Sequence, residues 1–261
     1  MNAPNRHSDI IALLTKNGQV EVDDLAQRLS VSSQTIRSDL RDLSNRGLLS
    51  RVHGGAVPLG AAAGRGYDER RQFNAAGKHA MAALVAEHIP EHCSISLNIG
   101  TSTEQVARAL SDHQGLTVLS NNINIINLMM SARLRELILV GGAVRQSDGA
   151  VVGEDAAAFI SRYKTDFAII GASALDTDGA ILDHDAREVT VARALLQNAR
   201  TRILVCDGSK FSRTAAVRIC AISELDMVIT DRPVPSDFAE AASAAGTKIL
   251  VASQAERTEN V

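Results

Sequence analysis

Residues 31–57 read VSSQTIRSDLRDLSNRGLLSRVHGGAV. Apolar residues recur in this stretch at the spacing of an α-helix, at Ile36, Leu40 and Leu43. Ser32 is a favourable N-cap for that helix, Val31 is placed to pack on its first turn, and Gly47 predicts its end. The residues after Gly47, LLSRVHGGAV, predict two short strands joined at a Gly-Gly turn.

A second short helix precedes this one, and the pair has the spacing of a helix-turn-helix. Leu25, Ala26 and Leu29 predict the first helix of the pair, and a short turn separates it from the second. An apolar face from Ile10 to Leu14 predicts a further helix before them. Three helices followed by a hairpin are typical of a winged helix-turn-helix DNA-binding domain, which we expect over residues 1–57.

The polar face of the helix that follows Ser32 has the side chains that read DNA. Gln and Arg side chains donate to base edges, and hydroxyl groups near a helix start suit phosphate oxygens. Arg, His and Gly residues of the following hairpin can approach the backbone or the minor groove. The predicted DNA contacts are Ser32, Ser33, Gln34, Thr35, Arg37, Ser38, Arg41, Arg51, His53, Gly54 and Gly55. A merely solvated surface helix is the alternative interpretation.

Charge is distributed unevenly along the chain. The formal net charge is −3 for 261 residues, which by itself argues mildly against a nucleic-acid partner. Residues 33–55 nevertheless hold four arginines against two aspartates, so the local balance is positive. The three cysteines, Cys93, Cys206 and Cys220, are widely spaced and form no CxxC pair. We therefore expect a reducing cytoplasm rather than a disulfide framework.

Composition limits the remaining classes. A chain of this length suggests about two domains, and 45% hydrophobic residues with only 3% aromatic ones predict an aliphatic core. No apolar h-region opens the sequence, and no apolar run reaches the ~20 residues of a membrane helix. We therefore expect neither a signal peptide nor a membrane partner.

From about residue 75 onward, apolar runs alternate with amphipathic stretches. The runs that predict strands are 94–99, 116–121, 136–142, 166–173, 202–208, 226–231 and 247–252. The stretches that predict helices are 103–111, 122–132, 154–163, 187–199 and 236–245. This rhythm predicts an α/β domain over residues 75–261, with a mostly parallel sheet between two layers of helices. Residues 58–74, rich in Gly, Ala and charge, are predicted to be a linker.

Gly, hydroxyl, amide and basic side chains follow several predicted strands, where open α/β sheets bind ligands. After the strand at 94–99, Gly100 precedes a helix start, and Thr101 and Glu104 match a capping box. The helix start suits an anion, and a plain capped helix is the alternative. Lys, Arg and amide groups would hold a small phosphorylated sugar or polyol. The predicted effector-binding residues are Asn98, Gly100, Thr101, Ser102, Thr103, Ser120, Asn121, Asn122, Gly141, Gly142, Arg145, Asp183, Glu188 and Lys210.

An acidic cluster in LDHDAREV, at 182–189, has the residue types of a metal or acid–base site. We favour a simpler interpretation, in which Asp185 caps the following helix, and expect no metal. The sequence holds no Walker A motif, and no GxGxxG follows a predicted strand. No nucleotide cofactor is therefore expected.

RHSDIIALL at 6–14, together with the stretch quoted first, resembles the N-terminal domain of the DeoR family of bacterial transcription regulators. The resemblance continues through NIGTST, LSNN, LVGGAVR, DGAVVGE, GASALDTDGAILD and DGSKFSRTA, so it covers essentially the whole chain. It implies a second domain similar to the ribose-5-phosphate isomerase and coenzyme A-transferase folds, which binds phosphorylated sugars or polyols. EVxxxRA at 188–194 and SKFxRxA at 209–215 are most similar to family members that regulate glycerol genes, which implies glycerol 3-phosphate as the effector.

Two positions depart from the family pattern. Asn98 stands where the family strand commonly has Asp, which keeps a hydrogen-bonding side chain without its charge. Ala186 and Arg187 precede Glu188 where the glycerol-responsive members have an aromatic residue or His. The added cation of Arg187 is expected to lie near the ligand and to alter effector choice.

Together, the residues and the resemblance predict a cytoplasmic transcriptional repressor that leaves double-stranded operator DNA when its effector binds. One short recognition helix reads little DNA alone, so a homo-oligomer, a dimer or tetramer, is expected on repeated half-sites. The alternative is a sugar-phosphate isomerase-like enzyme with an appended DNA-binding domain. Asp183 or Glu188 would then be the catalytic base.

Overall fold

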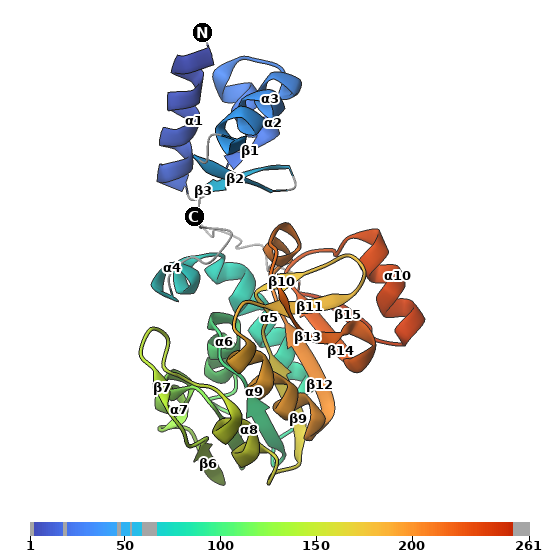
Figure 1. Ribbon diagram of the computed structural model, residues 1–261. Helices are drawn as coiled ribbons and strands as arrows, with labels where there is room; N and C mark the ends of the chain where they lie inside the picture. The colour runs from blue at the N-terminus through green and yellow to red at the C-terminus, as the bar shows by residue number, and fades with distance from the viewer. Residues whose placement is uncertain (1–2, 18–19, 46–47, 53, 59–66, 253–261) are drawn as a thin grey trace, which may run out of the picture. The chain divides into compact units, whose positions relative to one another are not determined.

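The computed structural model of the chain describes residues 3–17, 20–45, 48–52, 54–58 and 67–252. The chain divides into two compact units, residues 1–66 and residues 67–261. Figure 1 shows a small unit of helices with a hairpin and a larger unit built on a sheet. Each unit is described by itself.

The first unit is a winged helix-turn-helix, as predicted. Its elements in chain order are α1 (Ala3–Asn17), β1 (Val20–Glu21), α2 (Val22–Leu29), α3 (Ser33–Asn45), β2 (Leu49–Val52) and β3 (Gly55–Pro58). The helices share a core that includes Ile10, Leu25 and Ile36. The hairpin of β2 and β3 is antiparallel, and β1 adds a third strand beside β3 that the sequence did not predict.

Local contacts explain where the second helix of the motif starts. The hydroxyl of Ser32 accepts a hydrogen bond of 3.1 Å from the backbone N–H of Thr35, which confirms the predicted N-cap. Val31 packs against the core cluster that contains Ile36, as the predicted staple requires. Arg6 of α1 donates to the carboxylate of Asp39 on α3 at 2.9 Å. This buried ion pair fixes the first helix against the third.

The second unit is built on a seven-stranded sheet in which every pairing is parallel. Its strands, in spatial order, are β15 (Lys248–Val251), β14 (Met227–Thr230), β12 (Ala199–Val205), β9 (Thr165–Ile170), β4 (Ser94–Leu97), β5 (Thr117–Ser120) and β6 (Glu136–Leu139). All seven coincide with the predicted apolar runs. Chain order proceeds outward in one direction from β4 and in the other from β9, so the topology switches between these two central strands.

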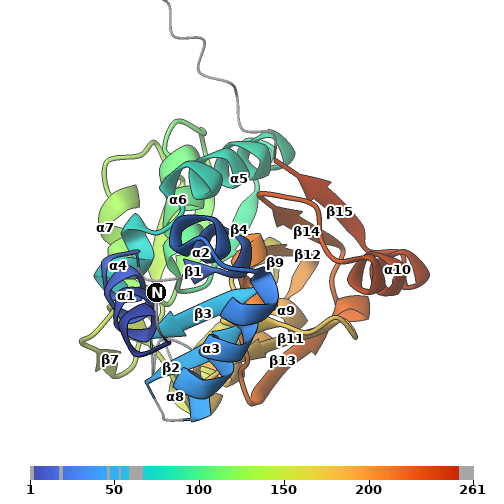
Figure 2. The same cartoon turned by 90° about the horizontal axis from the view of Figure 1, so that it is seen from above.

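Helices cover both faces of this sheet, as predicted. One face packs against α5 (Ala75–His88), α6 (Thr101–Ala109) and α7 (Ile123–Met129). The other packs against α8 (Glu154–Ile160), α9 (Ala186–Gln197) and α10 (Ser236–Ala245). Figure 2 shows α5 and α6 on the opposite side of the central strands from α9. The two buried layers are almost wholly aliphatic, with Phe238 the largest fully buried side chain among the described residues.

Several short elements were not predicted. An antiparallel sheet is formed by β10 (Ala174–Leu175), β11 (Ala180–Asp183) and β13 (Val217–Ala221). A two-stranded hairpin is formed by β7 (Val144–Arg145) and β8 (Ala150–Val151). Two 3₁₀ turns, η2 (Gly208–Ser212) and η3 (Ile222–Glu224), follow β12 and β13. These elements bring the loops after β9 and β12 together at the carboxyl ends of the strands of the large sheet.

The predicted linker at 58–74 is partly structured. Residues 67–72 form helix α4 (Tyr67–Gln72), and residues 59–66 lie outside the described part of the chain. The Tyr67 hydroxyl donates to Glu104 of α6 at 2.6 Å, which holds α4 against the second unit. For residues 67–74 the linker interpretation is therefore replaced by a helix and a turn that belong to this unit.

Candidate functional site

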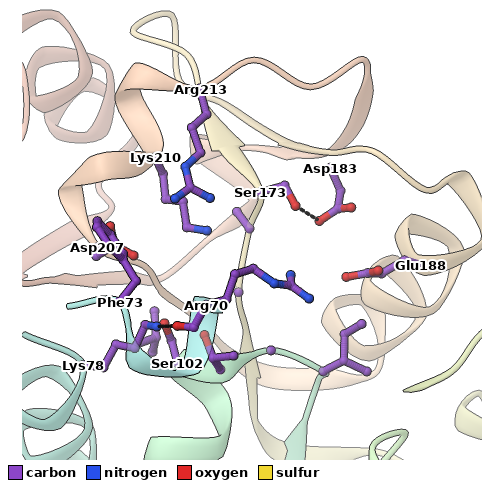
Figure 3. A pocket seen from close by; sticks show the side chains of 16 residues that line it. Arg70, Phe73, Lys78, Ser102, Ser173, Asp183, Glu188, Asp207, Lys210 and Arg213 are labelled. Carbon is purple, nitrogen blue, oxygen red and sulfur yellow. Dashed lines mark hydrogen bonds between the residues drawn. The ribbon is translucent and has the colours of Figure 1, made fainter. Parts of the chain in front are cut away.

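A pocket lies at the carboxyl ends of β4, β9 and β12, where the sheet topology switches. Open α/β sheets bind ligands at such a switch point. The cleft, counted out to its mouth, holds about 540 Å³, which suits a small metabolite. Its polar lining includes four cations and three carboxylates: Arg70, Lys78, Lys210, Arg213, Asp183, Glu188 and Asp207. Figure 3 shows these side chains converging on the pocket from α4, α5, β11, α9 and the turn after β12.

Three of the four pocket cations have no carboxylate partner among the described residues. Within the described residues, Lys78, Lys210 and Arg213 form no ion pair, and Arg70 approaches Asp148 only at 3.9 Å. Lys78 is only 3% exposed, and its ammonium group donates to the backbone carbonyl of Arg70. The buried Nε of Arg70 has no hydrogen-bond partner in the described part of the chain. These groups remain able to bind an anion.

Burial and mutual repulsion shift the ionisation of these groups. Burial lowers the pKa of Lys78 to about 8, although the nearby Asp207 carboxylate acts in the opposite direction. Burial and the adjacent Arg213 lower the pKa of Lys210 to about 8. A bound anion would reverse these shifts, because it favours the charged ammonium form.

The start of α6 forms the floor of the same pocket. Gly100 is the N-cap and has φ of +135°, a conformation that side chains disfavour. The Thr103 hydroxyl donates to the Gly100 carbonyl at 2.7 Å. The predicted capping box of Thr101 and Glu104 is wrong, because Glu104 instead accepts hydrogen bonds from Tyr67 and Asn124. The start of α6 therefore lines the pocket through Gly100, Thr101 and Ser102, while the Glu104 carboxylate is held by Tyr67 and Asn124.

Two carboxylates stand at the other end of the pocket. Asp183, at the end of β11, accepts a hydrogen bond of 2.9 Å from the hydroxyl of Ser173. Glu188, on α9, accepts one of 2.8 Å from Arg145. Burial, followed by the nearby Asp183 carboxylate, raises the pKa of Glu188 to about 7 despite the contact with Arg145. Asp185 caps α9 through the N–H of Arg187, as predicted, and no metal-binding cluster occurs among the described residues.

The structure brings six of the predicted effector residues together. Gly100, Thr101, Ser102, Asp183, Glu188 and Lys210 line the pocket. Arg187, by contrast, is exposed and pairs with Asp185 at 2.8 Å, so the expected cation near the ligand is not part of the pocket lining.

The other predicted effector residues do not line the pocket. Asn98, Thr103, Ser120, Asn121, Asn122, Gly141, Gly142 and Arg145 lie outside its lining. Ser120 donates to Leu97 and Asn121 donates to Val151, so both tie neighbouring segments together. Gly141 and Gly142 are exposed beyond β6. Arg145 contacts Asp148, Asp185 and Glu188, and it therefore supports the pocket from behind. A place near a strand end does not by itself predict the lining, because Asn98 and Thr103 follow β4 at the switch point and are buried outside the pocket.

Sequence reasoning missed several pocket residues. They are Arg70, Phe73, Lys78, Ser173, Asp207 and Arg213. Arg70 and Phe73 lie in the predicted linker, and Lys78 lies between that linker and the first predicted strand. A signal existed for Asp207 and Arg213, because both flank Lys210 in the family-like stretch DGSKFSRTA.

The predicted DNA face divides into exposed and bonded side chains. Gln34, Arg37, Ser38 and Arg41 are exposed on one side of α3. Ser33 instead donates to Asp23 at 2.8 Å, and Thr35 contacts Ser32 at 2.9 Å. These two hydroxyls therefore also hold the motif together.

The backbone geometry of the wing requires glycine at positions 54 and 55. Gly54 has φ of +80°, and a Cβ on Gly55 would lie 2.0 Å from the Val20 carbonyl oxygen. The tight turn and the neighbouring strand thus require both residues, whatever they do on DNA. Arg51 lies on β2, and His53 falls outside the described residues.

Comparison with known proteins agrees with this architecture. Residues 6–59 match the DeoR-like helix-turn-helix domain, and residues 73–232 match the DeoR C terminal sensor domain. The chain belongs to the DeoR family. It is therefore a DNA-binding transcriptional regulator with a separate sensor domain.

Curated DeoR-family relatives are similar over nearly their whole length. The chain is 40% identical to the glycerol-3-phosphate regulon repressor of Escherichia coli (strain K12), over 90% of this chain and 93% of the relative. It is 40% identical to the protein of the same name from Haemophilus influenzae, over 86% and 88%. It is 32% identical to the HTH-type transcriptional repressor CsqR of Escherichia coli, over 88% of each.

Solved structures outside the DeoR family are similar only in part. Ribose 5-phosphate isomerase A from Methanocaldococcus jannaschii matches with a TM-score of 0.38 and 16% identity, over 51% of this chain and 53% of the other. The eIF2B-beta2-delta2 complex from C. thermophilum matches with a TM-score of 0.44 and 16% identity, over 80% and 72%. No helix in the described residues is long and apolar enough to span a membrane.

Proposed function

We propose that this DeoR-family protein is a repressor that binds operator DNA through α3 and its wing, and that a phosphorylated polyol releases it. The observation that supports the effector is the group of four cations around the start of α6. Three of them lack ion-pair partners among the described residues, as expected of a site that binds a phosphate. Glycerol 3-phosphate is the preferred effector, because the relatives at 40% identity are named for it.

The proposed release is a linkage between two sites. A ligand weakens DNA binding only if it binds better to the conformation with poor DNA affinity. Helix α4 is suited to connect the sites, because Arg70 lines the pocket and residues 59–66 lead from α4 to the DNA-binding unit. A phosphate that engages Arg70 and Lys78 would hold α4 in one position.

The assembly and compartment form part of the same proposal. A single recognition helix covers one half-site, so the repressor acts as a homo-oligomer on repeated half-sites. The oligomer would be a dimer or a tetramer in the cytoplasm. Light scattering of the purified protein should give two or four times the chain mass. A monomer that still binds its operator tightly would contradict this.

Loss of a pocket cation tests the effector site. Lys210→Ala should leave operator binding unchanged and weaken glycerol 3-phosphate binding by roughly 30-fold, equivalent to about 2 kcal/mol. Gel retardation with increasing glycerol 3-phosphate measures both. Lys164→Ala is the matched control, because Lys164 is exposed just before β9 and donates only to Gln197. A Lys210→Ala protein with normal release would remove Lys210 from the site.

The rival function is an isomerase, and Asp183 and Glu188 are the observations that favour it. A raised carboxyl pKa beside a second carboxylate is suited to general acid–base chemistry. We propose that the protein is not an enzyme and that these groups only bind. Incubation with ribose 5-phosphate and glucosamine 6-phosphate should give no turnover, and product formation that Glu188→Gln abolishes would overturn this view.

A further inference from the structure

The pocket is electrically polarised along its length. Lys78, Lys210 and Arg213 lie toward one end, with the start of α6 as floor. Asp183 and Glu188 lie toward the other end, and the guanidinium group of Arg70 lies between the two groups (Figure 3). The carboxylate of Asp207 also lies at the first end, where the three cations outnumber it. A ligand that fills the cleft therefore meets mostly cations at one end and two carboxylates at the other.

Of the two carboxylates, Asp183 is the one without an ion-pair partner among the described residues. Its side chain is buried, with 6% of the residue exposed, and it forms no ion pair within the described residues. One oxygen accepts from the Ser173 hydroxyl at 2.9 Å, and the other from the N–H of His184 at 2.6 Å. The oxygen bonded to His184 also accepts from the N–H of Asp185 at 3.4 Å, so the oxygen bonded to Ser173 is the one with a lone pair left for a ligand hydroxyl.

Glu188 reinforces this end of the pocket. It is held in place by Arg145, which also contacts Asp148 and Asp185 and so shares its charge among three carboxylates. Arg187 also pairs with Asp185, and Arg70 approaches Asp148 at 3.9 Å. Negative charge still faces the cleft, because Asp183 has no ion-pair partner among the described residues. A ligand group placed here is stabilised if it donates hydrogen bonds and destabilised if it is an anion.

We infer that Asp183 and Glu188 are specificity-determining residues, which select phosphate monoesters with an uncharged, hydroxyl-bearing far end and reject those with a second anionic group there. The inference rests on the proposed function, because it assumes that the phosphate occupies the cationic end. Terminal and secondary hydroxyls donate to the two carboxylates. A ligand carboxylate in the same place has no proton to donate and is repelled.

Two three-carbon ligands test this selection as a matched pair. Glycerol 3-phosphate and 3-phosphoglycerate have the same phosphate and the same secondary hydroxyl, and differ in a terminal CH₂OH against a carboxylate. Calorimetric titration of the full-length protein at pH 8 should show at least tenfold weaker binding of 3-phosphoglycerate. This is the size of effect expected of a like-charge contact in a partly buried site.

A neutral replacement should relax the selection. Asp183→Asn keeps the shape of the side chain and removes its charge, so the affinity ratio of the two ligands should shrink by at least threefold. Glu188→Gln should also reduce this affinity ratio. If one variant fails to fold, the other variant and the ratio measured for the wild-type protein still test the selection. Asp155→Asn is the matched control, because Asp155 is exposed at the start of α8 and does not line the pocket.

The outcomes separate this inference from the proposed function. If glycerol 3-phosphate binds and 3-phosphoglycerate binds equally well, the selection is wrong while the effector site stands. If the ratio is large but does not change in Asp183→Asn or in Glu188→Gln, other residues set it and the inference is overturned. If neither ligand binds, the proposed function fails, and the inference fails with it.

Discussion

Lys78 and Lys210 hold two ammonium groups close to two guanidinium groups in a partly buried space. Each lysine has a pKa of about 8, so each ammonium group loses its proton in part as the pH approaches 8. A bound phosphate dianion favours the charged forms and raises these pKa values. Effector binding above pH 8 must therefore take up protons.

The first prediction at the residue scale concerns pH. The affinity for glycerol 3-phosphate should fall as pH rises from 7 to 9, because the lysines lose the protons that binding requires. Calorimetric titrations across this window measure it, and the phosphate itself stays doubly ionised there. Lys210→Arg keeps its charge and should give a flatter profile. A wild-type affinity that is constant to pH 9 would contradict the assignment of both lysines.

The second prediction concerns the exposed arginines of α3. Arg37→Ala and Arg41→Ala should each weaken operator binding roughly five- to tenfold and make the salt slope shallower by about one unit. Arg28→Ala removes the same charge from α2, where Arg28 pairs with Asp24, and serves as control. Filter binding across several salt concentrations measures the slope. Equal effects of all three changes would point to general charge rather than to this face.

At the scale of elements, two side-chain contacts each hold one helix in place. The first is the buried pair of Arg6 and Asp39, which joins α1 to α3. His7 adds a contact to the same carboxylate at 3.1 Å. Arg6 and His7 hold the pKa of Asp39 below its usual value, although burial acts against them. The sequence showed Asp39 only as a charge in a basic region, because its partner lies more than thirty positions away.

Asp39→Ala should therefore destabilise the DNA-binding unit strongly. Removing the carboxylate breaks the buried ion pair between Asp39 and Arg6, at a cost of about 3 kcal/mol. Urea unfolding of the full chain, followed by a probe in the first unit, measures the loss. Asp42→Ala on the exposed side of the same helix is the control and should change stability by less than about 0.5 kcal/mol. A similar loss in both variants would show that the pair is not important.

The second contact anchors α4. The Tyr67 hydroxyl bridges Glu104 and Asn124, at 2.6 and 2.7 Å, and the pKa of Tyr67 is raised by burial and by Glu104. Tyr67→Phe should leave glycerol 3-phosphate affinity within about twofold and reduce its effect on operator binding roughly threefold to tenfold. Tyr163→Phe is the matched control, because its ring stacks on Phe159 away from the pocket. Unchanged release by Tyr67→Phe would exclude α4 as the connection.

At the scale of the whole molecule, the sequence predicted the framework better than the site. Long apolar runs predict strands well, because a parallel strand buried on both faces has little freedom in composition, and all seven runs form the sheet. The pocket depends on which strand ends meet, and this follows from the strand order. Lys210 follows β12 and lines the pocket, whereas Asn121 follows β5, equally near the switch point on its other side, and donates to Val151 instead.

Short segments explain several of the remaining differences, whereas helix α5 (Ala75–His88) is long and was also not predicted. Strand β10 has two residues, too few for any periodic pattern to mark it. Helix α4 has six residues and is rich in charge, so in sequence it resembled a linker. Arg70 and Lys78 belong to helices rather than to strand ends, and only the folded chain brings them into the pocket lining.

The pocket draws its lining from positions 70 to 213, whereas the exposed recognition face lies within a few turns of α3. This difference has a genetic consequence. In a random mutant collection, alleles that lock the regulated genes off should be scattered over much of the second unit's coding region. Alleles that switch them on permanently by loss of DNA contact should cluster in one short block of codons. The spacing of these two phenotypes along the gene would thus record the architecture of the protein.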